Sequence, residues 1–97
     1  MITAFTKFET VDDLSATELE ILLTKLSKET IQEKGFIAYD VLSEKDFPRI
    51  YYVIEKWQSE EDLNNHSELV AEKGYATQAV HLLQNEINTI LLNNLNK

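Results

Sequence analysis

Alternation of apolar and polar positions predicts four strands along the chain. Residues 2–9, ITAFTKFE, are rich in β-branched and aromatic side chains and form the first. Residues 36–43, FIAYDVLS, form the second, and residues 50–57, IYYVIEKW, form the clearest one. The segment between them, residues 44–49, contains the only proline and predicts a turn. The last predicted strand, residues 87–95, alternates only imperfectly.

A helical repeat of leucines predicts a helix after the first strand. We expect Ser15 to be its N-cap, with Glu18 three residues on in the capping-box position. Gly35 follows the basic end of this helix. The leucines that recur at helical spacing, and that we expect to face the core, are Leu19, Leu22, Leu23 and Leu26.

A second helix, broken near Gly74, is predicted after the third strand. Ser59 is its expected N-cap, with Asp62 in the capping-box position and acidic residues in a first turn that suits the helix dipole. After Gly74 the expected apolar face of the continuing helix consists of Ala76, Ala79, Val80 and Leu83.

The order β-α-β-β-α-β predicts an α+β fold of the ferredoxin-like kind, with helices on one face of a four-stranded antiparallel sheet. We expect residues 1–97 to form one domain. Both alternating sets of strand 50–57 contain large apolar groups, so the second sheet face needs a cover. The same sheet of a second copy of the chain could bury this apolar face, which predicts a homodimer.

Composition excludes several classes of function. With 9 basic and 17 acidic residues the formal net charge is −8, and the basic residues form no cluster, so we expect no nucleic-acid partner. The chain has no cysteine, which excludes disulfides and thiolate metal sites. The start of the chain lacks the features of a signal peptide, and no apolar run is long enough to cross a membrane. We therefore expect a cytoplasmic protein without a membrane partner.

The block from Gly35 to His66 carries a recognisable pattern. Tyr39 lies within its first strand, and the spacing E-x-W-x-S-x-x-x-L-x-x-H then runs from Glu55 through Trp57 to His66. This pattern resembles the antibiotic biosynthesis monooxygenase (ABM) family, which includes quinol-monooxygenase-like members. The detailed match covers residues 35–66, about a third of the chain, while the order of elements matches over its full length.

The resemblance implies subunits that dimerise sheet to sheet into a dimeric α/β barrel, with a pocket between sheet and helices. It further implies oxidation of a quinol-like or other electron-rich small aromatic substrate by O2, without a metal, flavin or other cofactor. Fold relatives degrade haem using an Asn on the first strand, which ITAFTKF lacks, so haem is not favoured. After His66 the chain departs from the family pattern with SELVAEKGYATQAVHLLQ, so the resemblance does not predict which residues form the far wall of the pocket.

His66 is the candidate catalytic residue. It lies three residues after Leu63 and four before Val70, so helical spacing turns it toward the protein interior. An imidazole has a pKa near working pH and can deprotonate a quinol hydroxyl, giving an electron-rich phenolate. The competing interpretation is a histidine that only hydrogen-bonds at the junction of helix and sheet.

Three further residues are candidates for binding substrate. Trp57 can pack flat on an aromatic ring, although a tryptophan at a strand end more often belongs to the core or an interface. Tyr39 and Tyr52 are preferred over Tyr51 for the pocket. Glu55 shares the face of Trp57, and we interpret it as dimer-interface structure paired with Arg49 or a partner lysine.

Other chemistry finds little support in the sequence. His66 and His81 lie 15 positions apart without a matched carboxylate motif, so no metal site is predicted, and His81 is expected to be solvated. Two functions compete with a monooxygenase. One is an isomerase of a small carbonyl compound, and the other is a non-catalytic small-ligand-binding or stress-response module.

Overall fold

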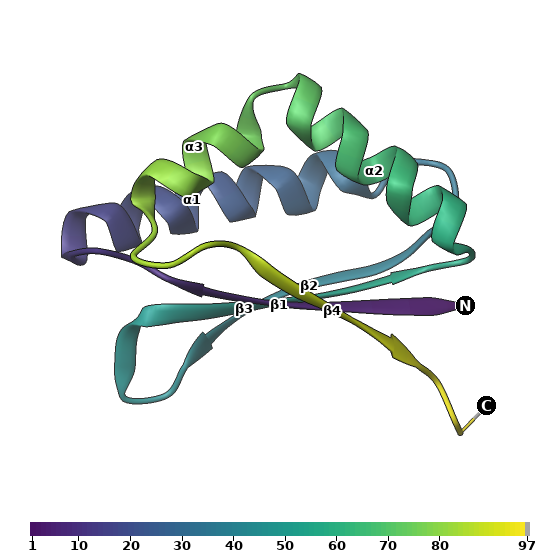
Figure 1. Ribbon diagram of the computed structural model, residues 1–97, viewed down its shortest axis with the longest axis horizontal. Coiled ribbons are helices and arrows are strands. Elements are labelled where there is room, and N and C mark those ends of the chain that lie inside the picture. Colours follow the sequence, from purple (N-terminus) through teal and green to yellow (C-terminus); the bar gives the residue numbers. More distant parts are fainter. Residues whose placement is uncertain (97) are drawn as a thin grey trace.

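The chain folds as a four-stranded sheet covered on one side by three helices. The computed structural model describes residues 1–96. In chain order the elements are β1 (Ile2–Glu9), α1 (Asp13–Thr30), β2 (Phe36–Glu44), β3 (Phe47–Trp57), α2 (Glu60–Glu72), α3 (Tyr75–Leu82) and β4 (Asn88–Asn93). The strands pair antiparallel in the order β2-β3-β1-β4, and all three helices lie on the same side of the sheet (Figure 1). The predicted α+β, ferredoxin-like fold is confirmed.

Strand β3 begins earlier than predicted. It starts at Phe47, which pairs with Glu44, so the turn shrinks to Lys45 and Asp46. Asp46 has φ 71°, a left-handed conformation that aspartate tolerates better than most residues. The pairing of β3 with β1 ends at Ile50, and the hairpin therefore extends beyond the rest of the sheet.

The predicted cap of α1 is wrong by three residues. Asp12 is the N-cap, and its Oδ1 accepts a hydrogen bond of 2.7 Å from the backbone N–H of Ser15. Ser15 is instead a buried residue of the first turn. Asp12 can take the capping role because aspartate caps a helix as well as serine does, and it lies three residues before the N–H that it binds. The face of α1 is as predicted, with all four leucines buried: Leu19, Leu22, Leu23 and Leu26.

The cap of α2 and the break near Gly74 are confirmed. Ser59 Oγ accepts from the Asp62 N–H at 3.1 Å and donates to Asp62 Oδ2 at 3.0 Å. Gly74, with φ 80°, is the N-cap of α3. The predicted face of α3 is partly wrong, because Val80 is 52% exposed whereas Tyr75 and Ala79 are buried. A helix that begins at Tyr75 turns that ring inward, which rotates Val80 toward solvent.

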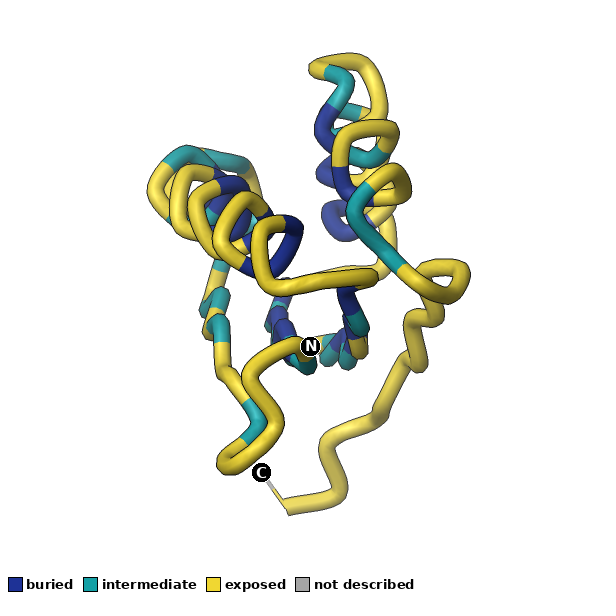
Figure 2. Tube along the Cα trace, turned by 90° about the vertical axis from the view of Figure 1, so that its left-hand side faces the viewer, coloured by how far each residue is buried: buried dark blue, intermediate teal, exposed yellow. Residues whose placement is uncertain are grey.

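The core lies between the sheet and the helices. Its larger cluster joins α1, α3 and the central strands through residues such as Leu19, Leu23 and Val53, and a smaller cluster consists of Ala4, Trp57 and Leu63. Figure 2 shows the buried positions along the inner sides of the helices and on the central strands, while the C-terminal segment is exposed. Among residues 1–96, no helix combines the length and apolar character needed to cross a membrane.

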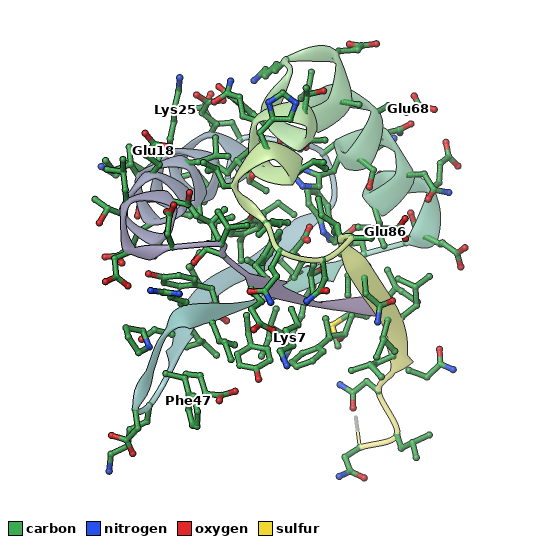
Figure 3. All side chains as sticks on the ribbon, turned by 60° about the vertical axis from the view of Figure 1, so that its left-hand side comes forward. Lys7, Glu18, Lys25, Phe47, Glu68 and Glu86 are labelled. Atoms are coloured by element: carbon green, nitrogen blue, oxygen red, sulfur yellow. The ribbon has the colours of Figure 1, made fainter. Side chains whose placement is uncertain are left out.

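The sheet is apolar on its second face as well. Directly paired residues point to the same side of a sheet, and Phe5 pairs with Ile54 on β3 and with Ile90 on β4. Figure 3 shows Lys7 on the side of the sheet away from the helices and Phe47 on the projecting hairpin. Ile90 is 49% exposed, as expected of a face without helices over it. The prediction that large apolar groups occupy both faces is confirmed.

Candidate functional site

A cavity of about 200 Å³ lies between the sheet and the helices. The sheet contributes polar groups to its lining, including Thr6, Tyr39 and Glu55, and α2 contributes His66. The apolar part of the lining comes mainly from the helices and includes Leu22, Leu23, Leu26, Val70 and Ala79. A larger depression of about 480 Å³ on the outer surface of α1 is lined by one helix only, so the cavity under the helices is the better candidate.

His66 is held between two carboxylates. Its side chain points inward from α2, and the residue is 5% exposed. The ring nitrogen Nδ1 lies 2.8 Å from Glu33 Oε1, and Nε2 lies 3.3 Å from Glu55 Oε1. Each ring nitrogen therefore lies beside a carboxyl oxygen, and the tautomer of the ring decides which of the two nitrogens donates.

Trp57 supports this arrangement from the core. Its Nε1–H donates to Glu55 Oε1 at 3.2 Å, and its ring centroid lies 4.8 Å from that of His66 with the planes tilted by 34°. Trp57 is 0% exposed and packs with Ala4 and Leu63, and it is not among the residues that line the cavity. Its geometry is that of a residue that orients Glu55 rather than one that stacks on a ligand.

The environment alters the acidity of two cavity groups. Burial raises the pKa of Glu55 above its ordinary value, while the charge of His66 and the hydrogen bond from Trp57 act in the opposite direction. Burial also raises the pKa of Tyr39 well above its ordinary value, and the nearby charges of Glu55 and Glu33 add to the rise. The Tyr39 hydroxyl therefore keeps its proton near neutral pH and is available as a donor.

The sequence suggested that Glu55 belongs to the dimer interface on the open sheet face, but the structure places it on the other face. It points to the helix side, is 9% exposed, and pairs with His66 and Trp57. Arg49, its expected partner, instead forms an exposed ion pair of 2.9 Å with Asp13. The sequence pattern could place Glu55 on the face of Trp57 but could not tell which face the helices cover.

Tyr39 and Tyr52 are separated by the sheet. The Tyr39 ring meets His66 edge to face at 6.2 Å between centroids and lines the cavity. Tyr52 lies on the face away from the helices, where its hydroxyl donates to Glu44 and its ring stacks on Phe5 at 5.4 Å between centroids. The structure thus brings His66 and Tyr39 together and leaves Tyr52 outside this cavity. Strand periodicity accounts for this, because Tyr39 pairs with Glu55, whereas Tyr52 alternates to the other face.

Glu33 is the functional candidate that the sequence pattern missed. It lies between α1 and β2, 33 positions before His66, so no short motif joins them. The nearest signal is Gly35, which has φ 80° and lies so close to α2 that a Cβ would be 2.1 Å from Asp62 Oδ2. This approach brings the loop against the start of α2, and Glu33 reaches His66 one helical turn after Asp62.

A second polar cluster borders the cavity near the break between α2 and α3. The Tyr75 hydroxyl donates to Glu29 at 3.0 Å, and Lys73 Nζ lies 3.1 Å from the same carboxylate. Lys25 Nζ lies 5.3 Å from the centroid of the Tyr75 ring. His81 is exposed on α3, as expected. In the described part of the chain no group of three or more His, Asp or Glu residues is arranged to hold a metal ion.

Comparison with known proteins supports one family and one fold. The family model described as antibiotic biosynthesis monooxygenase matches residues 1–82. No curated protein matches the chain. Among solved structures, Rv0793 from Mycobacterium tuberculosis is 21% identical with a TM-score of 0.88, and the match covers 99% of this chain and 96% of that one.

Two further solved structures extend the comparison. A conserved protein from Methanosarcina mazei is 25% identical with a TM-score of 0.85, covering 94% of this chain and 89% of that one. A variant of SnoaB, a cofactor-independent oxygenase from Streptomyces nogalater, is 17% identical with a TM-score of 0.84, covering 99% of this chain and 94% of that one. At such identities these likenesses concern the fold.

Proposed function

Because this chain belongs to the antibiotic biosynthesis monooxygenase family, we propose that it is a cofactor-independent monooxygenase acting with O2 on a quinol-like or other electron-rich small molecule. The observation that carries the proposal is a buried histidine, His66, held between Glu33 and Glu55 at the wall of a cavity. The similarity in fold to SnoaB, described as a cofactor-independent oxygenase, agrees with it.

The first step of the proposed reaction removes a proton from a substrate hydroxyl. Glu55 Oε1 contacts His66 Nε2 and Trp57 Nε1, while Oε2 makes no hydrogen bond with another atom of residues 1–96. We assign Oε2 as the atom that accepts the hydroxyl proton. Glu55 at the same time gives the proton on its Oε1 to His66 Nε2, which lies 3.3 Å away, so the proton reaches the imidazole through the Glu55 carboxyl. The resulting imidazolium donates through Nδ1 to Glu33 Oε1 at 2.8 Å.

The second step transfers electrons from the phenolate to O2. A carbon–oxygen bond forms at a ring carbon that carries hydrogen, giving a hydroperoxide, and loss of water then leaves a quinone. For a phenol the balance is ArH–OH plus O2 giving quinone plus H2O, so the substrate supplies all the electrons. The Tyr39 hydroxyl, which lines the cavity, is a donor for the developing oxygen charge.

The lining of the cavity favours this reaction over the competing isomerase. An isomerase of a phosphorylated carbonyl compound would need basic residues for the phosphate, and the described lining contains no lysine or arginine. A purely structural His66 would be expected in a filled interior, whereas His66 borders open space. These features disfavour the isomerase and a purely structural His66, while a module that binds a small ligand without catalysis is distinguished from an oxygenase by the activity assay below.

We also propose that two copies associate through the open sheet face into a dimeric α/β barrel. The support is the set of large apolar side chains on that face, which monomeric proteins rarely leave exposed together. Leu42, Ile90 and Leu92 are 48%, 49% and 44% exposed, although they share a face with Phe5 and Tyr52. The identical face of a second subunit offers a matching surface of the same kind.

Oxygen consumption with a panel of reduced quinols tests the reaction. We expect His66→Ala and Glu55→Gln each to lower the enzyme-dependent rate by about 100-fold or more, the usual contribution of a positioned acid–base group. His81→Ala is the matched control, because His81 is exposed on α3 and lies outside the cavity lining. Product analysis should give one water and one quinone for each O2 consumed.

Two results would count against the proposal. Equal rates in the wild type and His66→Ala would remove His66 from the chemistry. If no quinol of the panel is consumed faster than in a solution without protein, the monooxygenase itself is rejected.

A further inference from the structure

The size of the cavity limits the substrate. At about 200 Å³ it is only somewhat larger than a cavity of roughly 150 Å³ that holds benzene, and it lies below the roughly 300–1,000 Å³ of sites for drug-sized ligands. One aromatic ring with small substituents therefore fits under the helices. A flat system of three or four fused rings is too large to be enclosed by this cavity.

The distribution of polar groups orients that ring. On the sheet side the cavity offers Thr6, Thr89 and Glu55, with the Thr6 and Thr89 hydroxyls 2.9 Å apart. On the helix side the lining includes Leu22, Leu23, Leu26 and Val70. A molecule with a hydroxyl group on one edge and an apolar remainder suits both walls, because the hydroxyl gives the buried Glu55 a hydrogen-bond partner and the remainder lies against the leucines.

Charge restricts the substrate further. Apart from tyrosines, the ionisable side chains in the lining of the cavity are Glu55 and His66, and Glu33 contacts His66 from the other side of its ring. Among the described residues that line the cavity there is no lysine or arginine to neutralise an anion. A carboxylate or phosphate at the Glu55 end of the cavity would be desolvated beside Glu55 with one imidazole next to it, because Lys25 and Lys73 lie at Tyr75 and Glu29 and Lys73 is already paired with Glu29; this placement is unfavourable.

Resting on the proposed function, we propose that the substrate class is an uncharged, single-ring hydroxyarene, a phenol or dihydroxybenzene whose other substituents are small and apolar. Its hydroxyl lies at Glu55 and Tyr39, and its apolar edge lies against the leucines of α1. Multi-ring quinols and ring compounds that carry an acidic side group are excluded from the cavity.

Binding without oxygen tests the substrate class separately from the reaction. Calorimetric titration under nitrogen would use para-cresol, its anionic counterpart para-hydroxybenzoate, and a three-ring anthracenol. We expect para-cresol to bind, para-hydroxybenzoate to bind at least about tenfold more weakly, and the anthracenol to give no heat of binding.

A pair of variants locates the binding site. Ala76→Leu places a larger side chain in the lining of the cavity and should weaken para-cresol binding by about tenfold. Ala71→Leu makes the same change at an exposed position of α2 and should leave binding unchanged. Circular dichroism of both variants checks that the fold is kept.

The outcomes separate the two proposals. Failure of para-cresol to bind, or equal or tighter binding of the carboxylate or the anthracenol, overturns the substrate class. Equal effects of Ala76→Leu and Ala71→Leu also overturn it. Para-cresol binding without consumption of any quinol in oxygenated solution supports the class and rejects the monooxygenase, whereas oxidation of multi-ring quinols alone supports the monooxygenase and rejects the class.

Discussion

Replacing Gly35 with alanine would test how the loop after α1 is held against α2. Gly35 has φ 80°, and an added Cβ would lie 2.1 Å from Asp62 Oδ2 and 2.6 Å from Asp62 Cβ. Asp62 is also bonded in both directions to Ser59 at the start of α2. The substitution therefore strains the backbone and forces apart the two segments that carry Glu33 and His66.

Gly74 supplies a matched control within the same chain. It has the same φ of 80°, but no heavy atom of the described residues lies within 4 Å of the position a Cβ would take. Alanine at Gly74 therefore meets only the backbone strain, whereas alanine at Gly35 meets the strain and the clash. The difference between the two variants measures the contact with Asp62.

The expected magnitudes follow from these contributions. The left-handed conformation costs an alanine about 1–2 kcal/mol, partly offset by about 0.4–1 kcal/mol from a stiffer unfolded chain. The clash at Gly35 adds about 0.5–2 kcal/mol for the lost cap and about 1–3 kcal/mol for displaced neighbours. We expect the free energy of unfolding to fall by about 1 kcal/mol in Gly74→Ala and by about 3–5 kcal/mol in Gly35→Ala.

Urea denaturation measures both variants directly. Trp57 is the only tryptophan and is buried beside His66, so its fluorescence reports on the region in question. All samples should have the same protein concentration, because a dimer gains stability with concentration. Equal losses in the two variants would refute the reasoning, since the contact with Asp62 would then contribute nothing.

Three further predictions concern titration and assembly. Burial raises the pKa of Glu55, so the folded state holds a proton that the unfolded chain releases above about pH 4.5. The free energy of unfolding should therefore fall as the pH rises from about 4.5 through the raised pKa of Glu55, and it should fall less in Glu55→Gln. The raised pKa of Tyr39 predicts a similar fall above about pH 10, reduced in Tyr39→Phe, as followed by urea denaturation across that range. Ile90→Lys should convert a dimer to a monomer in sedimentation velocity, while Ile21→Lys, at a 66% exposed position of α1, should not.

Specific results would contradict each of these. Identical pH dependence in the wild type and Glu55→Gln would mean that Glu55 titrates alike in the folded and unfolded states. Tyrosine absorbance showing that all four tyrosines ionise near pH 10 would contradict the assignment of Tyr39. A wild-type chain that sediments as a monomer would reject the dimer, and so would an Ile90→Lys variant that remains dimeric.

Much of the fold could be predicted because its signals are local. Alternation in residues 2–9 and the leucine spacing of α1 depend on side-chain periodicity, and each is satisfied within a few residues of the chain. Capping at Ser59 is equally local, since donor and acceptor are three residues apart. The cap of α1 was predicted wrongly because Asp12 and Ser15 are both good capping residues, and only the bond between them decides which one starts the helix.

The candidate site was only partly predictable. His66 could be identified, because helical spacing shows that it faces inward. Glu33 could not, since its contact with His66 depends on the return of the chain after α1 and on the close approach at Gly35. Tyr52 was grouped with Tyr39 although strand pairing places them on opposite faces of the sheet.

The sequence by itself determined the order of elements, the two-sided apolar sheet and the family pattern from Gly35 to His66, because periodicity and spacing are properties of neighbouring residues. Only the tertiary structure decided that Glu55 faces the helices and that Glu33 completes a carboxylate pair around His66. The physical reason is that both contacts join residues distant along the chain, whose meeting depends on which sheet face the helices cover. Which face the helices cover depends on how all the elements pack together, and no single segment of the chain determines it.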